Sequence, residues 1–402
     1  MLLKNLSQKK IGIIGFGITG KSVERFLRKY SEALISIWFS HIGDLKNFIE
    51  QQDYVVFSPG IDQRPFLKFK DKFINELDLF GSCFKKKSIA ITGTLGKTTI
   101  TTLIHKLIPK SVCGGNIGVG ALDLISQQKN FDWAVLELSS FQLEFSSIFA
   151  PDIAVLTNFY PNHLDRHKNM EEYFEAKSKI FKYQKEGQIL ILTKDLISKC
   201  TMIQHYLKNY KGRVVFADDS DVEISGIDTF PINLKIVQTV LNQIGVRKQK
   251  ISLENVRLEH RLEKFKTING VDFYNDSKAT VIESTISAIK KISNNNRPII
   301  LILGGTDKGV DRGQISKFIK TENIKQVFVL GDGYKEIENC RRHCSLKDLV
   351  HDMIRFVESG DQVLFSPGGA SFDYFKNYEE RGRLFKELVL GLTLRYNFSS
   401  FA

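Results

Sequence analysis

The chain has 402 residues, 42% of them hydrophobic and 25% charged, which is typical of a soluble globular protein and excludes a disordered or fibrous one. This length predicts two or three domains, and no stretch approaches the roughly 20 apolar residues of a membrane span. The net charge of +12 comes from scattered basic residues without interleaved aromatics, so we expect a Lys-rich solvated surface and no binding of nucleic acid.

Cysteine usage and the N-terminal sequence both indicate a cytoplasmic protein. The first residues lack the charge order and the uninterrupted apolar run of a secretory signal. The five cysteines are odd in number and spread along the chain, so they do not suggest a disulfide framework. The stretch "CRRHC" (340–344) has two thiols and an imidazole but no second ligand cluster, which favours a surface helix over a zinc site.

Apolar, β-rich runs alternate with segments of helical periodicity along the chain. In chain order, the expected strands with the turn residues that end them form three groups: 10–20, 33–40 and 53–61; then 88–93, 132–140, 152–158, 187–193 and 212–218; then 297–305, 325–332 and 361–369. Continuous apolar strands between helices are typical of parallel sheets covered on both faces. We therefore predict an α/β protein of three domains: a Rossmann-like N-terminal domain (1–86), a central P-loop-type domain with a mostly parallel sheet (87–257) and a Rossmann-like C-terminal domain (258–402).

The first glycine-rich turn, "GFGITG", follows a predicted strand and precedes a predicted helix, as in a dinucleotide-binding fold. Gly15, Gly17 and Gly20 could direct backbone N–H groups and a helix N-terminus at a phosphate. A nicotinamide-dependent enzyme should carry an acid at the end of the next strand, but "SIWFSH" (36–41) has none. We therefore interpret this turn as a diphosphate cradle and not as an NAD site.

The second glycine-rich turn, "TGTLGKTT" (92–99), is a compressed phosphate-binding loop. Only two residues separate Gly93 from Gly96, whereas the usual loop has four at this point. Its backbone amides could still surround a triphosphate, with Lys97 on the phosphate oxygens and the hydroxyl of Thr98 on Mg²⁺. The sequence thus predicts a site for ATP and magnesium, and the spacing excludes most ordinary ATPases and GTPases.

This compact turn resembles that of the Mur ligase family, ATP-dependent enzymes that join an amino acid to a carboxylate. Six further motifs occur in the family's order: "GGNIG" (114–118), "LELSSFQLE" (136–144), "HLDRH" (163–167), "EHRLE" (259–263), "YNDSKAT" (274–280) and "LFSPGGASFDYFKNYEERG" (364–382). The last resembles the C-terminal signature of the members that add D-glutamate to UDP-N-acetylmuramoyl-L-alanine in peptidoglycan precursor synthesis. The resemblance covers nearly the whole chain and implies ligation through an acyl phosphate, with ADP and phosphate as the other products.

Several alternative functions stay open at this point. A Mur-type ligase could add another amino acid, although the "DNPR" tetrapeptide of the members that add diaminopimelate or lysine is absent. Folate polyglutamylation would need the central and C-terminal domains but not the "GFGITG" unit. A nucleotide-binding regulatory protein without ligase activity would not need the full set of metal-site residues. For the favoured function we expect small-molecule partners only, UDP-N-acetylmuramoyl-L-alanine and D-glutamate, and a monomeric chain.

Four positions carry the expected metal chemistry. Glu137 ends one apolar strand and His163 follows another, and the carboxyl ends of parallel strands meet at one edge of a sheet. The resemblance implies that Thr98 and Glu137 hold one Mg²⁺, with His163 helping to hold a second. Lys177 falls on the apolar stripe of a predicted helix, where burial would favour a neutral amine that can take up CO₂. Similar enzymes carry a carbamylated lysine at the matching position, and we predict one here.

The resemblance also implies the other contacts of the site. The catalytic residues are Lys97, Glu137, His163, Lys177 and Asn116. The contacts to ATP come from Gly93, Thr94, Gly96, Lys97, Thr98, Thr99, Asn233, Arg261, Asp276 and Lys278. The contacts to the UDP-linked substrate come from Gly17, Ile18, Thr19, Asn116, Ser139 and Gln142, and those to D-glutamate from Thr280, Lys308, Ser371, Phe372 and Tyr378. Two positions depart from the family's pattern: Asn162 replaces an acid and Val281 replaces an asparagine.

Overall fold

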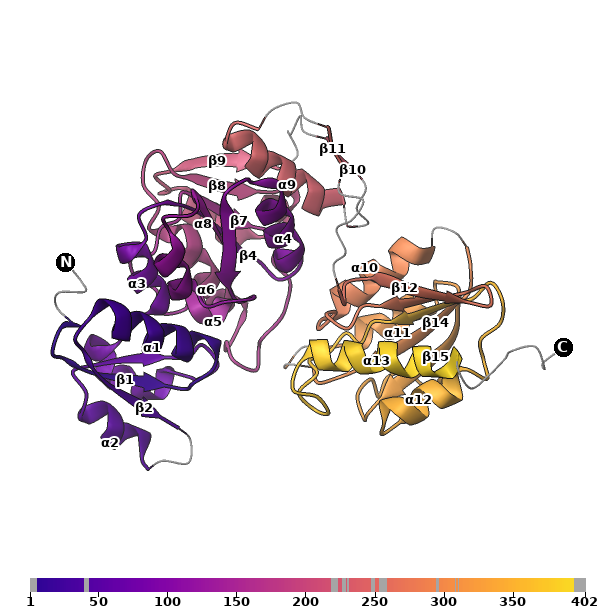
Figure 1. Ribbon diagram of the computed structural model, residues 1–402. Coiled ribbons are helices and arrows are strands. Elements are labelled where there is room, and N and C mark those ends of the chain that lie inside the picture. The colour runs from indigo at the N-terminus through magenta and orange to yellow at the C-terminus, as the bar shows by residue number, and fades with distance from the viewer. Residues whose placement is uncertain are drawn as a thin grey trace. The chain divides into compact units, whose positions relative to one another are not determined.

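The computed structural model describes residues 6–39, 43–217, 223–225, 229, 231–246, 250–252, 259–293, 296–307, 309 and 311–393. The chain forms two compact units: Met1–Phe159 with Arg166–Asn255, and Tyr160–Asp165 with Val256–Ala402 (Figure 1). Both units alternate parallel strands with helices, so the predicted α/β class is confirmed. The predicted boundary at 86/87 coincides with the start of a new sheet inside the first unit, whereas the one at 257/258 lies outside the described residues.

The first unit begins with a small parallel sheet of strand order β2-β1-β3. Its elements are β1 (Lys10–Ile14), α1 (Ile18–Tyr30), β2 (Leu34–Trp38), α2 (Leu45–Glu50), β3 (Tyr54–Phe57), the 3-10 helix η2 (Arg64–Lys72) and α3 (Glu76–Cys83). α1 turns Val23, Phe26 and Leu27 inward and ends in Arg28 and Lys29, which suit the negative end of a helix dipole. Gly20 allows the close approach of α1 to β1, because a Cβ there would overlap the carbonyl oxygen of Gly15.

The second sheet of this unit has six parallel strands in the order β5-β6-β4-β7-β8-β9. Its strands are β4 (Lys87–Thr92), β5 (Ser111–Gly115), β6 (Trp133–Glu137), β7 (Ile153–Leu156), β8 (Ile189–Leu192) and β9 (Arg213–Phe216). The helices are α4 (Lys97–Leu107), η3 (Ala121–Gln127), α5 (Ser140–Leu143), α6 (Met170–Lys182), α7 (Lys194–Lys199), α8 (Thr201–Leu207) and α9 (Pro231–Gln243). Strands β10 (Glu223–Ser225) and β11 (Lys250–Ser252) form a separate parallel pair.

Helices cover both faces of this six-stranded sheet, as its continuous apolar strands require. Alternate strand residues, among them Ala90, Leu136 and Leu156, share one core with Phe174 and Phe181 of α6. α4 and α9 pack against each other, and Figure 1 shows them on the opposite side of the sheet from α6 and α8. This packing fixes α4 and α6 on either side of the turn that follows β4.

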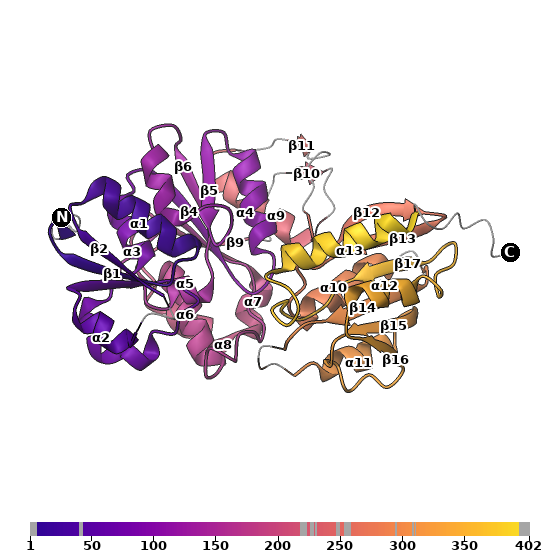
Figure 2. The same cartoon turned by 60° about the horizontal axis from the view of Figure 1, so that its bottom comes forward.

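The second unit contains a six-stranded sheet of order β12-β13-β17-β14-β15-β16, in which only the pairing of β12 with β13 is antiparallel. The strands are β12 (Glu263–Ile268), β13 (Val271–Asn275), β14 (Ile299–Gly304), β15 (Ile324–Leu330), β16 (Cys340–His343) and β17 (Gln362–Phe365). The helices are α10 (Ile282–Ser293), α11 (Gly313–Ile319), α12 (Leu346–Met353) and α13 (Tyr378–Thr393). α12 and α13 pack side by side over one face of the sheet (Figures 1 and 2), and α10 and α11 join the core on the other.

The prediction of a surface helix at residues 340–344 was wrong. Residues Cys340–His343 form the edge strand β16, which pairs in parallel with β15 from Val327 to Leu330. The sequence of these four residues has no alternation of apolar and polar side chains. They form a strand because they pair with the open edge of β15. All five cysteines are free thiols in the structure.

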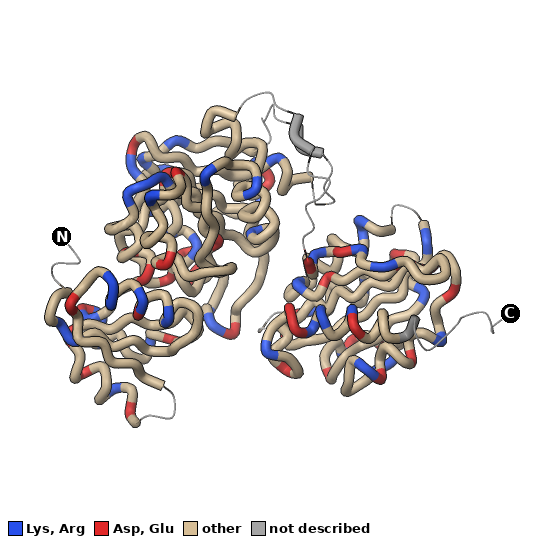
Figure 3. Tube along the Cα trace, viewed as in Figure 1, with Lys and Arg blue, Asp and Glu red and all other residues tan. Residues whose placement is uncertain are grey.

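Charge and hydropathy follow the predictions from composition. Figure 3 shows basic and acidic positions interspersed along the helices and strands of each unit, so the excess of positive charge is not confined to one element. In the described part of the chain, every helix is too short or too polar to serve as a membrane span.

Candidate functional site

The compressed loop between β4 and α4 is a rigid turn that depends on two glycines. Gly93 (φ +140°) and Gly96 (φ +83°) have backbone conformations that L side chains rarely adopt. The residues that follow β7 hold the loop from outside: Asn158 Oδ1 accepts the backbone N–H of Leu95 at 2.8 Å, and Thr157 Oγ1 donates to the carbonyl of Leu95 at 2.6 Å. The loop is therefore fixed by its neighbours on the sheet and leads directly into α4.

Two lysines converge on one carbonyl group of this loop. Lys97 Nζ donates to the carbonyl oxygens of Gly93 and Thr94, each at 2.9 Å, and Lys177 Nζ donates to that of Gly93 at 2.8 Å. Lys177 is only 2% exposed, which confirms its predicted place on the buried face of α6. Its burial, together with the charge of Lys97, holds the pKa of the Lys177 amine well below its ordinary value. This lowered pKa favours the neutral form of the Lys177 amine.

Glu137, at the end of β6, accepts hydrogen bonds from two other predicted site residues. Its Oε2 accepts from Thr98 Oγ1 at 2.5 Å, and its Oε1 accepts from Asn116 Nδ2 at 3.0 Å. A hydroxyl and a carboxylate oxygen are the kinds of ligand that Mg²⁺ prefers. In the described part of the chain no three His, Cys, Asp or Glu side chains gather in a metal-binding geometry, so any ion here would rely on a ligand set other than a cluster of these four residue types.

His163 lies in the segment 160–165, which clusters with the second unit. Its backbone has a positive φ of +58°, and its N–H donates to Asn162 Oδ1 at 2.9 Å. Asn162, the residue that replaces an acid of the family pattern, is buried and supports this turn. The asparagine thus has a local structural role next to the predicted metal ligand.

Asn233 on α9 lies against the loop, although only a loose sequence match suggested it. A Cβ placed on Gly96 would come within 2.6 Å of Asn233 Oδ1, so the asparagine side chain occupies the space that the glycine leaves free. Its Nδ2 donates to Thr229 Oγ1 at 3.1 Å. The structure therefore places the amide of Asn233 beside the predicted nucleotide loop.

Five of the six residues predicted to contact the UDP-linked substrate lie at two helix N-termini of the first unit, and the sixth, Asn116, lies in the loop after β5. Gly17 is the N-cap of α1 and makes no side-chain cap, so the first N–H groups of this 13-residue helix remain available to an anion. Ile18 is exposed, whereas Thr19 is buried, and its hydroxyl donates to Glu76 Oε2 at 3.2 Å. Only the backbone of Thr19 is thus free for a ligand.

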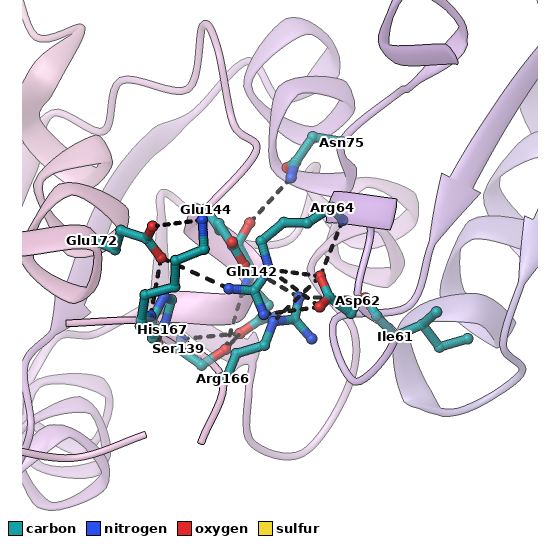
Figure 4. Close-up of polar contacts among 12 residues, drawn as sticks. Ile61, Asp62, Arg64, Asn75, Ser139, Gln142, Glu144, Arg166, His167 and Glu172 are labelled. Atoms are coloured by element: carbon teal, nitrogen blue, oxygen red, sulfur yellow. Dashed lines mark hydrogen bonds and ion pairs between the residues drawn. The ribbon is translucent and has the colours of Figure 1, made fainter. Parts of the chain in front are cut away.

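The second of these N-termini belongs to α5. Ser139 and Gln142 form a capping box: Ser139 Oγ accepts the N–H of Gln142 at 3.3 Å, and the Gln142 side chain accepts the N–H of Ser139 at 3.1 Å. Asn75 Nδ2 donates to the backbone carbonyl of Gln142 at 3.1 Å. Figure 4 shows these three residues together, so α5 is tied to the start of α3.

Sequence reasoning missed an ionic cluster beside α5, the Arg166 cluster of Asp62, Arg64, Glu144, Arg166 and Glu172 (Figure 4). Arg166 Nη2 lies 3.2 Å from Glu144 Oε2, and Arg64 forms a bidentate ion pair with Asp62. Arg64 also lies 3.7 Å from Glu172 of α6. Burial raises the pKa of Glu144, and Arg166 opposes that shift. The cluster connects the segment after β3 to the segments around α5 and α6.

The second unit brings several predicted residues together after β13. Asp276 is 8% exposed and accepts from Ser366 Oγ at 2.7 Å and from the N–H of Leu262 at 3.0 Å. Burial raises the pKa of Asp276 to about 7, and nearby Arg261 partly offsets that effect. Lys278 Nζ lies 4.6 Å from the centroid of the Tyr378 ring.

The remaining predicted residues of the second unit differ in exposure. Thr280 is half-buried, Ser371 is buried and Phe372 is 75% exposed, so the ring of Phe372 is accessible to a substrate. Lys308 lies outside the described residues.

Known proteins resemble this chain in both sequence and fold. The profiles of the "Mur ligase middle domain" and the "Mur ligase, glutamate ligase domain" match residues 91–227 and 260–369. The chain is 34% identical to the UDP-N-acetylmuramoylalanine–D-glutamate ligase of Caldicellulosiruptor bescii, over 95% of this chain and 93% of that protein. It is 33% identical to the protein of the same name from Francisella philomiragia, over 96% and 98%.

Solved structures share the fold at low sequence identity. The structure of MurF ligase from Thermotoga maritima in complex with ADP superposes with a TM-score of 0.60 at 15% identity, covering 96% of this chain and 95% of that one. E. coli FolC in complex with DHPP and ADP gives a TM-score of 0.57 at 12% identity, covering 83% and 99%.

Proposed function

The chain belongs to the Mur ligase family, and we propose that it joins D-glutamate to UDP-N-acetylmuramoyl-L-alanine with conversion of ATP to ADP and phosphate. The observation that carries this proposal is the meeting of Thr98, Glu137 and Asn116 beside a loop whose Gly93 carbonyl accepts from Lys97 and Lys177. The names of relatives at 33–34% identity over nearly the full chain support the choice of substrates.

Amide formation from a carboxylate requires that one of its oxygens become a good leaving group. Bound ATP supplies that change by phosphorylating the carboxylate, and the amine of D-glutamate then displaces the phosphate. The protein's task is to position three anionic partners and to neutralise their charge. The N-terminus of α4 would face the nucleotide phosphates, and Lys97 would supply the cation next to them.

The residues beside the loop fit a magnesium ion. The Thr98 hydroxyl and the Glu137 carboxylate are oxygen donors already in contact, and Asn116 holds the second carboxylate oxygen in place. The buried Lys177 amine, whose pKa is lowered, fits conversion to a carbamate, which would add a second anionic group on this side of the loop. His163 is proposed as a further ligand. Magnesium, when bound, would stabilise the negative charge of the phosphoryl group during its transfer.

The two substrates are assigned to different elements. The N-terminus of α1 at Gly17 and Ile18 would hold the diphosphate of the UDP-linked substrate, while Ser139 and Gln142 at α5 would face its sugar. In the second unit, Lys308 and Ser371 would pair with the carboxylates of D-glutamate. Their partners would be Thr280, Phe372 and Tyr378, with Arg261, Asp276 and Lys278 directed at the nucleotide.

The test is phosphate release from ATP and magnesium with UDP-N-acetylmuramoyl-L-alanine, comparing D-glutamate, L-glutamate, L-lysine and diaminopimelate as acceptors of the activated carboxylate. We expect stimulation by D-glutamate alone and loss of product with Lys97→Ala. Stimulation by another amino acid alone would replace the proposal by that specificity, and an absence of any stimulation would refute ligase activity. We place the enzyme in the cytoplasm, because its five cysteines are free thiols, and we propose that it is a monomer.

A further inference from the structure

Glu76 is a buried carboxyl group at the start of α3, and three separate segments of the first unit converge on it. The residue is 5% exposed. Its Oε2 accepts from the hydroxyl of Thr19 at 3.2 Å, and its Oε1 accepts from the backbone N–H of Ala121 at 3.2 Å. The side chain of Gln142 also interacts with this carboxyl and favours its charged form.

The three partners share one property: each belongs to a segment proposed to bind the UDP-linked substrate. Thr19 lies in the first turn of α1, at the proposed diphosphate cradle. Ala121 begins η3, which follows directly on the loop that carries Asn116. Gln142 belongs to the capping box of α5. These segments are far apart in sequence, and Glu76 contacts all three at once.

The start of η3 packs closely against α1 beside Glu76. A Cβ on Gly120 would come within 3.4 Å of Glu76 Oε1, and it would also lie against the Cβ of Ser22 on α1. Ser22 Oγ in turn accepts the backbone N–H of Asp123 at 3.2 Å. The start of η3 therefore fits against α1 and Glu76 without room for a side chain at position 120.

A carboxylate in this place lowers the stability of the fold unless hydrogen bonds or protonation compensate for its desolvation, because burial of a charge is unfavourable. Desolvation raises the pKa of Glu76 to about 7. Asp123 on η3 raises it further, although Asp123 is itself paired with Arg25 of α1 at 2.7 Å. A second acidic residue, Glu144, lies at the end of α5 and pairs with Arg166. The hydrogen bonds from Thr19 and Ala121 act in the opposite direction, since each favours the carboxylate.

We propose that Glu76 is a positioning residue for the UDP-linked substrate: its carboxylate holds the α1 turn, the segment after Asn116 and the α5 cap in the one arrangement that fits this substrate. The inference rests on the proposed function, since the ligand assignments of these segments come from it. Glu76 does not touch the substrate. It acts through Thr19, Ala121 and Gln142.

The test measures the three KM values and kcat for Glu76→Ala, Glu76→Gln and the wild type. With Glu76→Ala we expect KM for the UDP-linked substrate to rise at least about tenfold, which corresponds to about 1.4 kcal/mol. KM for ATP and for D-glutamate should stay within about twofold. In the wild type, KM for the UDP-linked substrate should fall as pH rises through about 7, because only the carboxylate accepts from all its partners. Glu76→Gln should remove that step.

Two controls separate this proposal from general destabilisation and from a wrong function. Glu171→Gln changes an exposed glutamate at the start of α6 and should leave all three KM values unchanged. Calorimetric binding of UDP alone to wild type and Glu76→Gln reports on the cradle even if the protein does not ligate D-glutamate. Equal rises in all three KM values, or unchanged UDP binding together with unchanged KM values in both Glu76 variants, would overturn the proposal.

Discussion

Replacing Gly93 by alanine should disrupt the compact loop in two ways. The backbone at this position has φ +140°, and holding an L-residue there costs about 1–3 kcal/mol. The new Cβ would also overlap Thr157 Oγ1, which donates to the carbonyl of Leu95 at 2.6 Å. Displacing Thr157 would remove that hydrogen bond, at about 1 kcal/mol. The sum is a loss of about 2–4 kcal/mol, concentrated at the loop proposed to hold ATP.

The assay combines thermal unfolding with the KM for ATP. For a unit of this size each kcal/mol shifts the melting temperature by about 2–4 °C, so Gly93→Ala should lower it by about 5–15 °C and raise KM for ATP. Gly187→Ala is the matched control, because Gly187 has φ +86° with no atom within 4 Å of the added Cβ. It should cost about 1 kcal/mol and leave KM for ATP unchanged. If Gly93→Ala resembled Gly187→Ala in both measurements, the reasoning about this loop would be refuted.

Three further predictions concern buried charges. Lys177→Ala should abolish phosphate release in the ligation assay, with partial return on adding formate or acetate, because a small carboxylate can replace the proposed carbamate in the space left free. Asp78→Ala should destabilise the first unit by about 2–4 kcal/mol in urea unfolding, because Asp78 is buried and accepts from Ser146 Oγ and the backbone N–H groups of 147–149. Arg166→Met should lower the free energy of unfolding more at pH 8 than at pH 5. Glu144, whose pKa is already raised by burial, loses its paired cation in this variant. The resulting penalty applies only where the Glu144 carboxyl is ionised.

Each of these predictions has a variant that isolates its cause. Lys177→Met fills the space and should show no recovery with formate; recovery in this variant would argue against a carbamate. Asp78→Asn keeps one acceptor oxygen and should lose less stability than Asp78→Ala, so equal losses would count against the hydrogen-bond explanation. Adding Glu144→Gln to Arg166→Met should remove the pH dependence, and its persistence would exclude Glu144 as the source.

The sequence predicted correctly those features that depend on the local pattern of apolar residues or on the position of a residue at the end of a strand. The continuous apolar runs predicted parallel strands, because residues buried on both faces of a sheet must be apolar. Glu137 and Thr98 met as expected, since Glu137 ends β6 and Thr98 follows the carboxyl end of the neighbouring parallel strand β4. The burial of Lys177 followed from the 3.6-residue period of α6.

The contacts that the sequence did not reveal join segments far apart in the chain. Arg166 and Asp62 are separated by 104 positions, and Thr19 and Glu76 by 57, so no local spacing relates them. The strand at Cys340–His343 was missed for a similar reason, because an edge strand is defined by its neighbour and not by its own apolar period. Such pairings become visible only once the topology places α1, α3, α5 and η3 together.

The two lysines on the Gly93 carbonyl explain why the shortened loop needs Lys177. Two ammonium groups that donate to one carbonyl repel each other, so the charge of Lys97 helps to lower the pKa of the Lys177 amine. Lys97 lies at the half-buried start of α4, whereas Lys177 is enclosed on α6, and this burial is the larger cause of the lowered pKa of Lys177. A neutral amine is the form that reacts with CO₂, and a carbamate would turn the repulsion between the two side chains into an attraction. The compact loop and the buried lysine are thus parts of one electrostatic arrangement, in which removing the charge of Lys97 should also raise the pKa of Lys177.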